Sequence, residues 1–265
     1  MEPQQVLLIA TAVLCMAAIY STVGHGGGSG YLAVLAIAAI APEQMRSTAL
    51  LLNVVVSSIA TWKFASTGTF RKDLFVPLVC ASIPAAFLGG YIDLPSHVYK
   101  PIVGAVLLFA AIRLFIPIKG NEQTKKPMLC VVLVAGIVIG FFSGTIGIGG
   151  GIFLSPLVLL IGWTTAKQTA AISAPFILVN SISSLGGIAL DNTGLPIDLM
   201  FVAPLAIAVV IGGFVGATYG SKKLGHQGLR TVLGVVLLIA AGKMFLSVQG
   251  DLNQESADAI KSTHE

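Results

Sequence analysis

The sequence predicts an all-α polytopic membrane protein, made of two inverted repeats of about five segments each, with a broken glycine-rich helix in each half. Three observations predict it: the composition, two long blocks without charge, and an internal repeat. Of the 265 residues, 55% are hydrophobic and 10% are charged, and the mean hydropathy is +0.93. A soluble domain carries about 25% charged residues. This composition excludes a soluble fold and a disordered main body, and three cysteines exclude a disulfide scaffold.

Two blocks of the chain carry no Asp, Glu, Lys or Arg: residues 3–42 and residues 127–166, each 40 residues long. A bilayer core needs about 20 helical residues to cross, so each block holds two segments. Glycines interrupt both blocks, at 24–30 and 147–151. The segment after each interruption is short: eleven residues separate Gly30 from Pro42, and as a helix they cover only ~16 Å. We expect glycine turns at membrane depth, and whether each pair of segments spans or forms a re-entrant hairpin stays open.

Three further apolar segments follow each block, at roughly 47–66, 74–92 and 98–117, and at roughly 168–189, 198–220 and 229–247. The expected organisation is a first membrane repeat (1–118), a cytoplasmic linker (119–127), a second membrane repeat (128–248) and a polar C-terminal tail (249–265). The first segment lacks the preceding basic residues of a signal peptide, so we expect it to stay in the membrane. No metal or redox spacing links the cysteines, and buried, inert thiols are expected at Cys15, Cys80 and Cys130.

The two halves also repeat in sequence. The pattern G-x-V-L-L-x-A-A-x-[RK]-x-F occurs at 104–115 and at 234–245, and Asn53 recurs as Asn180. Placing the basic loops in the cytoplasm puts 11 of the 15 Lys and Arg residues inside, as the positive-inside rule requires. This accounts for the net charge of +4 without nucleic acid. An odd number of segments per half then predicts opposite orientations and both termini outside, an architecture of many secondary transporters.

The two glycine clusters are candidate anion sites. Each turn opens into a short helix whose first N–H groups lack intrahelical partners, and such an end acts like about half a positive charge. A repeat places two such ends near one another, which favours a small anion; the substrate-binding candidates are Gly26, Gly27, Gly28, Gly149, Gly150 and Gly151. The alternative is close helix packing, which glycine also permits. We prefer packing for Gly212, Gly213 and Gly216.

Polar side chains of the third segments are the other candidates for substrate binding. Asn53 and Asn180 donate an amide either to an oxygen of the anion or to a neighbouring helix. Ser57 lies one turn after Asn53, and bonding to a carbonyl of its own helix is the alternative there. Ser173 comes shortly before Pro175, which frees a backbone carbonyl, so this position either lines a cavity or marks a hinge.

Ionisable residues near the glycine clusters suggest further roles. His25 lies within the first cluster and is the candidate for proton coupling, because histidine titrates near neutral pH; the alternative is a neutral histidine bonded to backbone. Arg46 and Lys167 flank the second and third segments, where they either attract anions or snorkel to the interface, and snorkelling is preferred. Arg113 and Lys243 are expected to be anchors.

The second cluster carries a family resemblance. The run Gly147-Ile-Gly-Gly-Gly-Ile-Phe-Leu-Ser-Pro-Leu-Val-Leu-Leu-Ile-Gly162, followed by Ala-Ala-Ile-Ser at 170–173, resembles the glycine-rich signature of the TauE/SafE sulfite exporter family, also called the toluene-sulfonate uptake permease family. The first half departs from it, with His25 in its cluster and no proline matching Pro156. The resemblance implies transport of sulfite or of a small organosulfonate such as sulfoacetate. The family includes exporters and importers, so direction does not transfer.

The sequence therefore predicts a secondary transporter that moves a small sulfur-containing anion across the cell (inner) membrane, driven by H⁺. An uncoupled small-anion channel is the alternative from another class. An intramembrane enzyme or an assembly subunit is a weaker one, because no catalytic constellation is present. The expected partners are the substrate and the lipid bilayer, without nucleic acid, cofactor or metal, and a homo-oligomer stays open.

Overall fold

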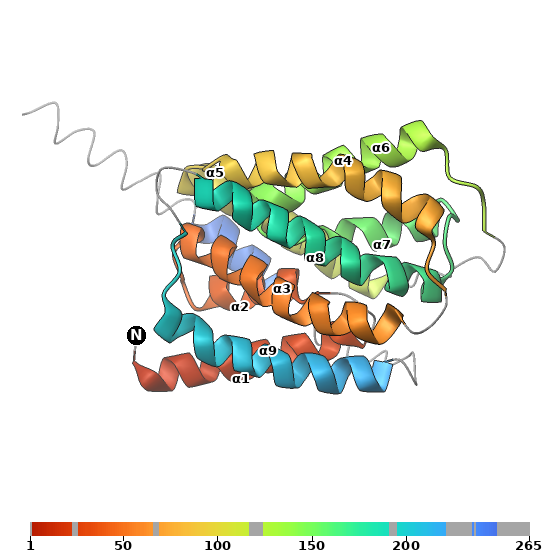
Figure 1. Cartoon of the computed structure of the whole chain (residues 1–265). Helices are drawn as coiled ribbons and strands as arrows, with labels where there is room; N and C mark the ends of the chain where they lie inside the picture. Colours follow the sequence, from red (N-terminus) through yellow and green to blue (C-terminus); the bar gives the residue numbers. More distant parts are fainter. Residues whose placement is uncertain are drawn as a thin grey trace, which may run out of the picture.

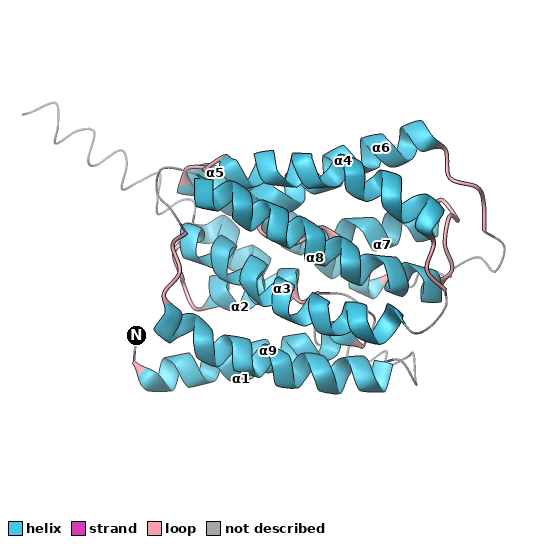
Figure 2. Ribbon diagram, viewed as in Figure 1, coloured by secondary structure: helices cyan, strands magenta, loops and turns pink. Residues whose placement is uncertain are grey.

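The computed structural model describes residues 2–22, 26–65, 69–116, 124–190, 195–220, 235 and 237–247, and within them the secondary structure is helical (Figure 2). The labelled helices are α1 (Pro3–Ser21), α2 (Gly28–Ile37), α3 (Pro42–Ala65), α4 (Lys72–Tyr91), α5 (Ser96–Phe115), α6 (Leu129–Ile146), α7 (Gly151–Leu160), α8 (Ala166–Leu190) and α9 (Leu199–Gly220). A further short helix is Leu237–Ser247.

Among the described residues, six helices are long and apolar enough to cross a membrane: α1, α4, α5, α6, α8 and α9. Their outer faces expose large apolar side chains such as Leu8, Val134 and Met200. The helices that follow the glycine clusters, α2 and α7, have 10 residues each and cover about 15 Å, half of a bilayer core. The predicted all-helical, multi-pass membrane fold is confirmed.

The three cysteines lie on outer helix faces. Cys15, Cys80 and Cys130 are exposed on α1, α4 and α6 respectively. The expectation that they are buried was wrong. The reason is that lipid tails are as apolar as a protein core, so hydropathy does not separate a lipid-facing position from an interior one.

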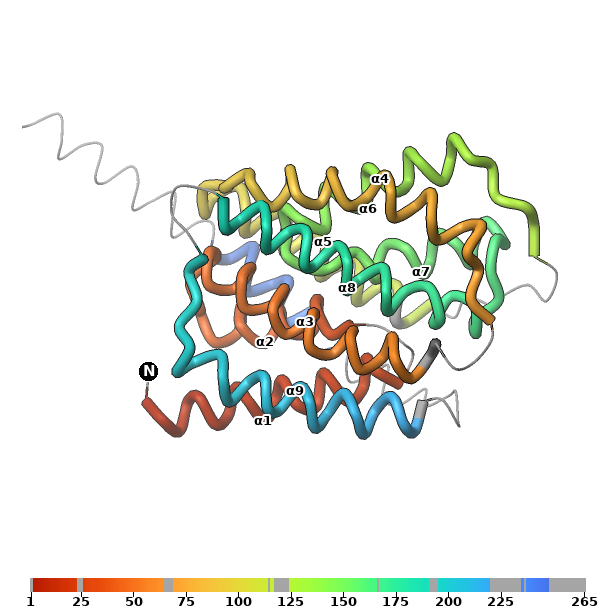
Figure 3. The backbone as a smooth tube through the Cα atoms, in the orientation of Figure 1, coloured from red at the N-terminus to blue at the C-terminus, as the bar shows by residue number. Residues whose placement is uncertain are grey.

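The long helices are arranged in layers (Figures 1 and 3). α4 and α6 lie on one side, α1 and α9 lie on the other, and α3 and α8 lie between them. α4 packs on α6 and α8, while α9 packs on α1 and α3, so the fourth helix of each half packs on the first and third helices of the other. Corresponding helices run in opposite directions through the bundle, as α3 and α8 do in Figure 1. Opposite orientation of the halves in the membrane stays a prediction.

Glycines allow the same close approach at equivalent places in both halves. Gly89 on α4 lies against the carbonyl oxygen of Phe141 on α6, and Gly216 on α9 lies against that of Ala18 on α1. A Cβ at either glycine would collide with that carbonyl. Gly212 is placed in the same way against α1. The packing interpretation of Gly212 and Gly216 is therefore confirmed.

Two hydrophobic cores lie on either side of the contact between α3 and α8. One core gathers buried side chains of α1, α2, α3, α5, α9 and the 237–247 helix. The other gathers those of α4, α6, α7 and α8. Between them, Ala60 of α3 lies with Ala170 and Ala174 of α8. We call this α3–α8 contact the seam. Small side chains lie at the seam between the two cores, and each core contains helices of both halves.

The second glycine turn belongs to a helical hairpin, formed by α6 and α7. The N–H of Lys125, before α6, donates to the carbonyl of Gly162, after α7, at 2.8 Å, so the two ends of the α6–α7 pair lie together. Beside them, Arg71 pairs with Asp73 at 2.5 Å and donates to the carbonyl of Trp163 at 3.0 Å. The bond to Asp73 raises the pKa of Arg71. The turn is thus held inside the bundle while both ends of its hairpin stay at one side.

Candidate functional site

The second glycine turn connects α6 to α7 in a backbone conformation that needs glycine. Gly147, Gly149 and Gly150 have φ values of +88°, +80° and +81°, a region that costs other residues about 1–2 kcal/mol. Gly150 caps α7 without a side-chain hydrogen bond, and the N–H groups of Gly151 and Ile152 have no acceptor among the described residues. Since buried N–H groups are usually paired, this buried helix end offers donors to an anion.

The first glycine turn leads into α2 in the same way. Gly27 precedes the helix with φ −86° and ψ 13° and forms no side-chain cap. The N–H groups of Gly28, Ser29 and Gly30 have no acceptor in the part of the chain that the structure describes, and all three residues are buried. His25, the candidate for proton coupling, lies outside the described residues.

The two turns meet across the seam, where Asn53 joins them. The Nδ2 of Asn53 on α3 donates to the carbonyl of Ile148 in the second turn at 2.9 Å. A Cβ on Gly28 would collide with that same carbonyl, and one on Gly26 would lie 2.9 Å from Asn53 Oδ1. Asn53 is fully buried, and its Oδ1 has no hydrogen-bond partner. One amide of the first half therefore contacts the turns of both halves.

Asn180 does not make the equivalent contact. Its Nδ2 donates at 2.8 Å to the carbonyl of Phe176 in its own helix, α8. Its side chain is fully buried, and its Oδ1 has no partner. The repeat in sequence thus places two asparagines at corresponding positions, but only Asn53 reaches across the seam.

Each of the two candidate serines forms a hydrogen bond with a neighbouring group of the protein. The hydroxyl of Ser57 donates to the carbonyl of Asn53, which is the within-helix bond that the sequence offered as the alternative. Ser173 Oγ lies 3.0 Å from Ser155 Oγ on α7, so Ser173 links α8 to the short helix. Both side chains are buried. Each hydroxyl oxygen can accept a further hydrogen bond.

Arg46 is a buried cation that bonds to the backbone. The preferred interpretation from the sequence, that Arg46 snorkels to the membrane interface, was wrong. Its side chain is 6% exposed, so it does not snorkel to the interface. The carbon stem packs on the second turn, where a Cβ on Gly147 would lie 3.0 Å from Arg46 Cγ. The guanidinium donates to four backbone carbonyls, those of Gly89, Gly90, Ile92 and Gly144. A charge in an apolar helix was visible in the sequence, but carbonyl partners leave no sequence pattern.

Two further residues beside the turns carried no sequence signal. A Cβ on Gly149 would lie 2.8 Å from Ser181 Oγ and 2.7 Å from Ile177 Cγ2. Ser181 is buried and its hydroxyl has no partner. Ile177 is one of many apolar residues on α8, and only the fold reveals that it adjoins a glycine turn.

Other charged and metal-binding candidates lie away from the turns. Lys243 donates to the carbonyl of Ile37 at the end of α2, where a cation is favoured by the helix dipole. Lys167 is exposed at the start of α8. Within the described ranges, no group of three or more His, Cys, Asp or Glu side chains is placed to hold a metal ion.

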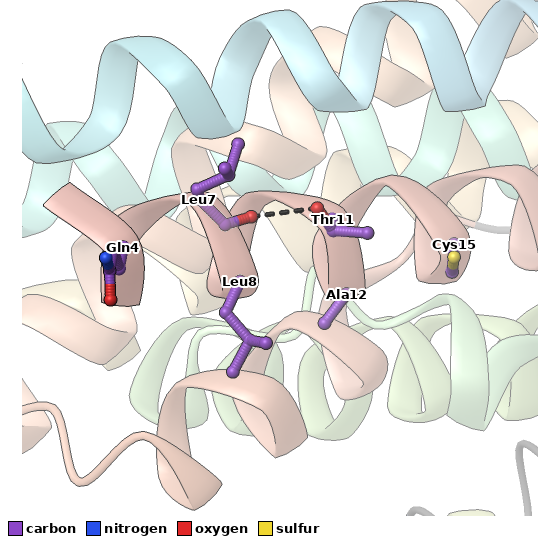
Figure 4. Close-up of a pocket in the computed structure, with 6 residues that line it drawn as sticks. All are labelled: Gln4, Leu7, Leu8, Thr11, Ala12 and Cys15. Atoms are coloured by element: carbon purple, nitrogen blue, oxygen red, sulfur yellow. Dashed lines mark hydrogen bonds between the residues drawn. The ribbon is translucent and has the colours of Figure 1, made fainter.

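A depression of about 450 Å³ lies on the outer face of α1 (Figure 4). It is lined by Gln4, Leu7, Leu8, Thr11, Ala12 and Cys15, and the Thr11 hydroxyl donates to the Leu7 carbonyl of the same helix at 2.8 Å. Leu7 and Leu8 are largely exposed. An apolar surface of one membrane helix is a lipid contact, so this depression is not the candidate site.

Comparison with known proteins identifies relatives over most of the chain. The family described as Sulfite exporter TauE/SafE matches residues 8–244. The probable membrane transporter protein y4hK of Sinorhizobium fredii is 38% identical over 241 residues, which are 89% of this chain and 96% of the relative. The probable membrane transporter protein YfcA of Escherichia coli (strain K12) is 25% identical over 238 residues, covering 86% and 84% of the two chains. No solved structure matches the chain.

Proposed function

Because the chain belongs to the sulfite exporter TauE/SafE family, we propose that it is a secondary transporter that moves a small sulfur-containing anion across the cytoplasmic membrane, coupled to H⁺. The family and the names of the relatives support membrane transport rather than catalysis. Sulfite, sulfoacetate or another organosulfonate is the proposed substrate. The observation that carries the anion proposal is the meeting of two buried helix N-termini beside Asn53.

The chemistry of this place favours an anion over a cation or a neutral solute. Each N-terminus contributes about half a positive charge, and the effect is stronger where water is excluded. The N–H groups of α2 and α7 supply donors from two directions, and Asn53 and Ser181 add an amide and a hydroxyl. A sulfonate has three oxygens that accept hydrogen bonds, whereas an amine brings only donors to this donor-rich place.

Binding is tested by thermal stabilisation of the purified protein. A ligand at a hundred times its dissociation constant adds ~2.7 kcal/mol to the free energy of unfolding, so sulfite or a sulfonate should raise the melting temperature. Glucose and ethylamine serve as neutral and cationic controls and should leave it unchanged. Stabilisation by the amine, with none by any sulfur oxyanion or sulfonate, would contradict the proposal.

Transport and coupling are tested in liposomes with an imposed pH gradient. A coupled transporter should accumulate the anion against its own gradient, whereas an uncoupled channel only equilibrates it. His25→Gln should abolish the accumulation while downhill exchange continues, and His97→Gln, at the start of α5, is the matched control. Accumulation that persists in His25→Gln would remove His25 from the coupling proposal without affecting the anion site.

A further inference from the structure

We propose that Ile177 sets the size of the substituent that a transported sulfonate carries, so that the protein takes organosulfonates with a short carbon chain and rejects aromatic ones. This rests on the proposed function and deepens it. The inference follows from the position of one apolar side chain between the two glycine turns. Nothing in the sequence distinguishes this isoleucine from the others on α8.

Ile177 contacts the turns of both halves. Its Cγ2 would lie 2.9 Å from a Cβ on Gly26 in the first turn and 2.7 Å from a Cβ on Gly149 in the second. A Cβ on Gly151, the first residue of α7, would lie 2.7 Å from Ile177 Cγ1 and closer still to Cδ1. The side chain is 2% exposed. It therefore fills the space beside both buried helix ends.

Gly151 and Ile177 form a complementary pair. Among the described residues, Ile177 supplies the only atoms within 4 Å of a Cβ built at Gly151, apart from the chain neighbours and the helix's own backbone. The backbone of Gly151 has no positive φ, so its conformation admits any residue. The Ile177 side chain thus leaves no room for a Cβ at the first residue of α7. A headgroup bound at the N–H of Gly151 has the methyl groups of Ile177 as its immediate neighbours.

A buried hydroxyl borders the same space and indicates a ligand that accepts hydrogen bonds. Ser181 Oγ adjoins Gly149 and has no hydrogen-bond partner, so its O–H can donate to a sulfonate oxygen. Burying a polar atom unpaired costs free energy, and a bound acceptor recovers it. The hydroxyl and the backbone N–H donors on one side and an isoleucine on the other match a charged headgroup with a short carbon chain. An arenesulfonate needs the volume that the Ile177 side chain occupies.

The experiment measures inhibition of uptake by a series of sulfonates: methanesulfonate, ethanesulfonate and toluenesulfonate. In the wild type, toluenesulfonate should be the weakest inhibitor. Ile177→Ala should improve its inhibition constant relative to that of methanesulfonate by at least about 10-fold, the range that pocket size controls. Ile177→Phe should exclude ethanesulfonate as well. The matched control is Ile172→Ala, a fully buried residue of the same helix within the second core, which should lower stability without changing the ratio.

A double-mutant cycle tests the geometry without any ligand. Gly151→Ala should lower the melting temperature, and Ile177→Ala should reduce that loss, so that the double variant melts higher than the two single losses predict. Additive losses would overturn the contact itself. An unchanged inhibition ratio in Ile177→Ala would overturn the size limit even if the cycle is non-additive. If no sulfonate or sulfite inhibits or stabilises the wild type, the proposed function fails, and the cycle still reports on the contact.

Discussion

The two glycine turns occupy equivalent positions in the repeat but are held differently. The second turn has three glycines with positive φ and is anchored from the first half. Tyr99 donates to the carbonyl of Ile146 at 2.9 Å, and Asn53 donates to that of Ile148. Both isoleucines pack in the core that contains α1 and α9. The first turn receives no such bond from Asn180, which donates within its own helix.

This difference shows which features the internal repeat duplicates and which it does not. Helix pairing recurs because it depends on small residues at fixed spacing, such as Gly89 and Gly216. The turns differ because the residues that hold them differ: the offset that relates Asn53 to Asn180 relates Arg46 to Ser173. We infer that the scaffold is symmetric and that the two halves of the site are not. The following predictions compare pairs of positions, in order of decreasing expected difference.

The largest expected difference concerns membrane orientation, because a cysteine is either labelled from outside the cell or not labelled at all. With Cys15, Cys80 and Cys130 replaced by serine, a single cysteine is introduced as Asn192→Cys in the second half or as Gln123→Cys in the linker. An impermeant maleimide added to intact cells should label the first variant and leave the second unlabelled, because the basic linker is expected in the cytoplasm. The reverse result would overturn the predicted orientation, and labelling of both would contradict the topology that places the linker and this loop on opposite sides.

A large difference is expected between Gly149→Ala and Gly26→Ala. A Cβ at either position meets Asn53 and Ile177, so the steric environments are matched. Gly149 has a positive φ, of +80°, and this strain should make its alanine variant less stable by an additional 1–2 kcal/mol or so. Thermal unfolding in detergent measures the difference, with Gly186→Ala as the control, since its Cβ position is 3.6 Å from the nearest neighbouring atom. Equal losses would mean that the turns share one conformation.

A moderate difference is expected between Asn53→Ala and Asn180→Ala. Loss of Asn53 leaves the buried carbonyl of Ile148 without its donor, which costs about 1–3 kcal/mol. Loss of Asn180 should cost less, because the Phe176 carbonyl lies within the regular part of α8 and keeps its helical donor. Melting temperatures give the two costs, and substrate stabilisation should also fall further in Asn53→Ala. A larger loss in Asn180→Ala would reverse the asymmetry argued above.

Periodicity and composition predicted much of the fold because they reflect the thickness of the bilayer and the close approach of helices. They predicted the short helices and the glycine turns, and the repeat drew attention to Asn53, which contacts both turns. They did not predict that Arg46 bonds to helix-end carbonyls or that Ile177 lies between the turns. Those facts depend on which helices of different halves become neighbours. Exposure of the cysteines was missed for a related reason, since lipid and core look alike in hydropathy.

The smallest difference is expected between Gly89→Ala and Gly216→Ala, which test the symmetric scaffold. In each, the added Cβ collides with a backbone carbonyl of the partner helix, on Phe141 or on Ala18. Backbone does not rotate away as a side chain does, so both variants should lose stability by overpacking, about 1–3 kcal/mol. Because the contacts are equivalent, the two losses should agree within about 0.5 kcal/mol, and substrate stabilisation of the folded fraction should be retained in both. Thermal unfolding with and without substrate measures this. Losses that differ by more than that margin would show that the asymmetry of the turns extends into the helix packing.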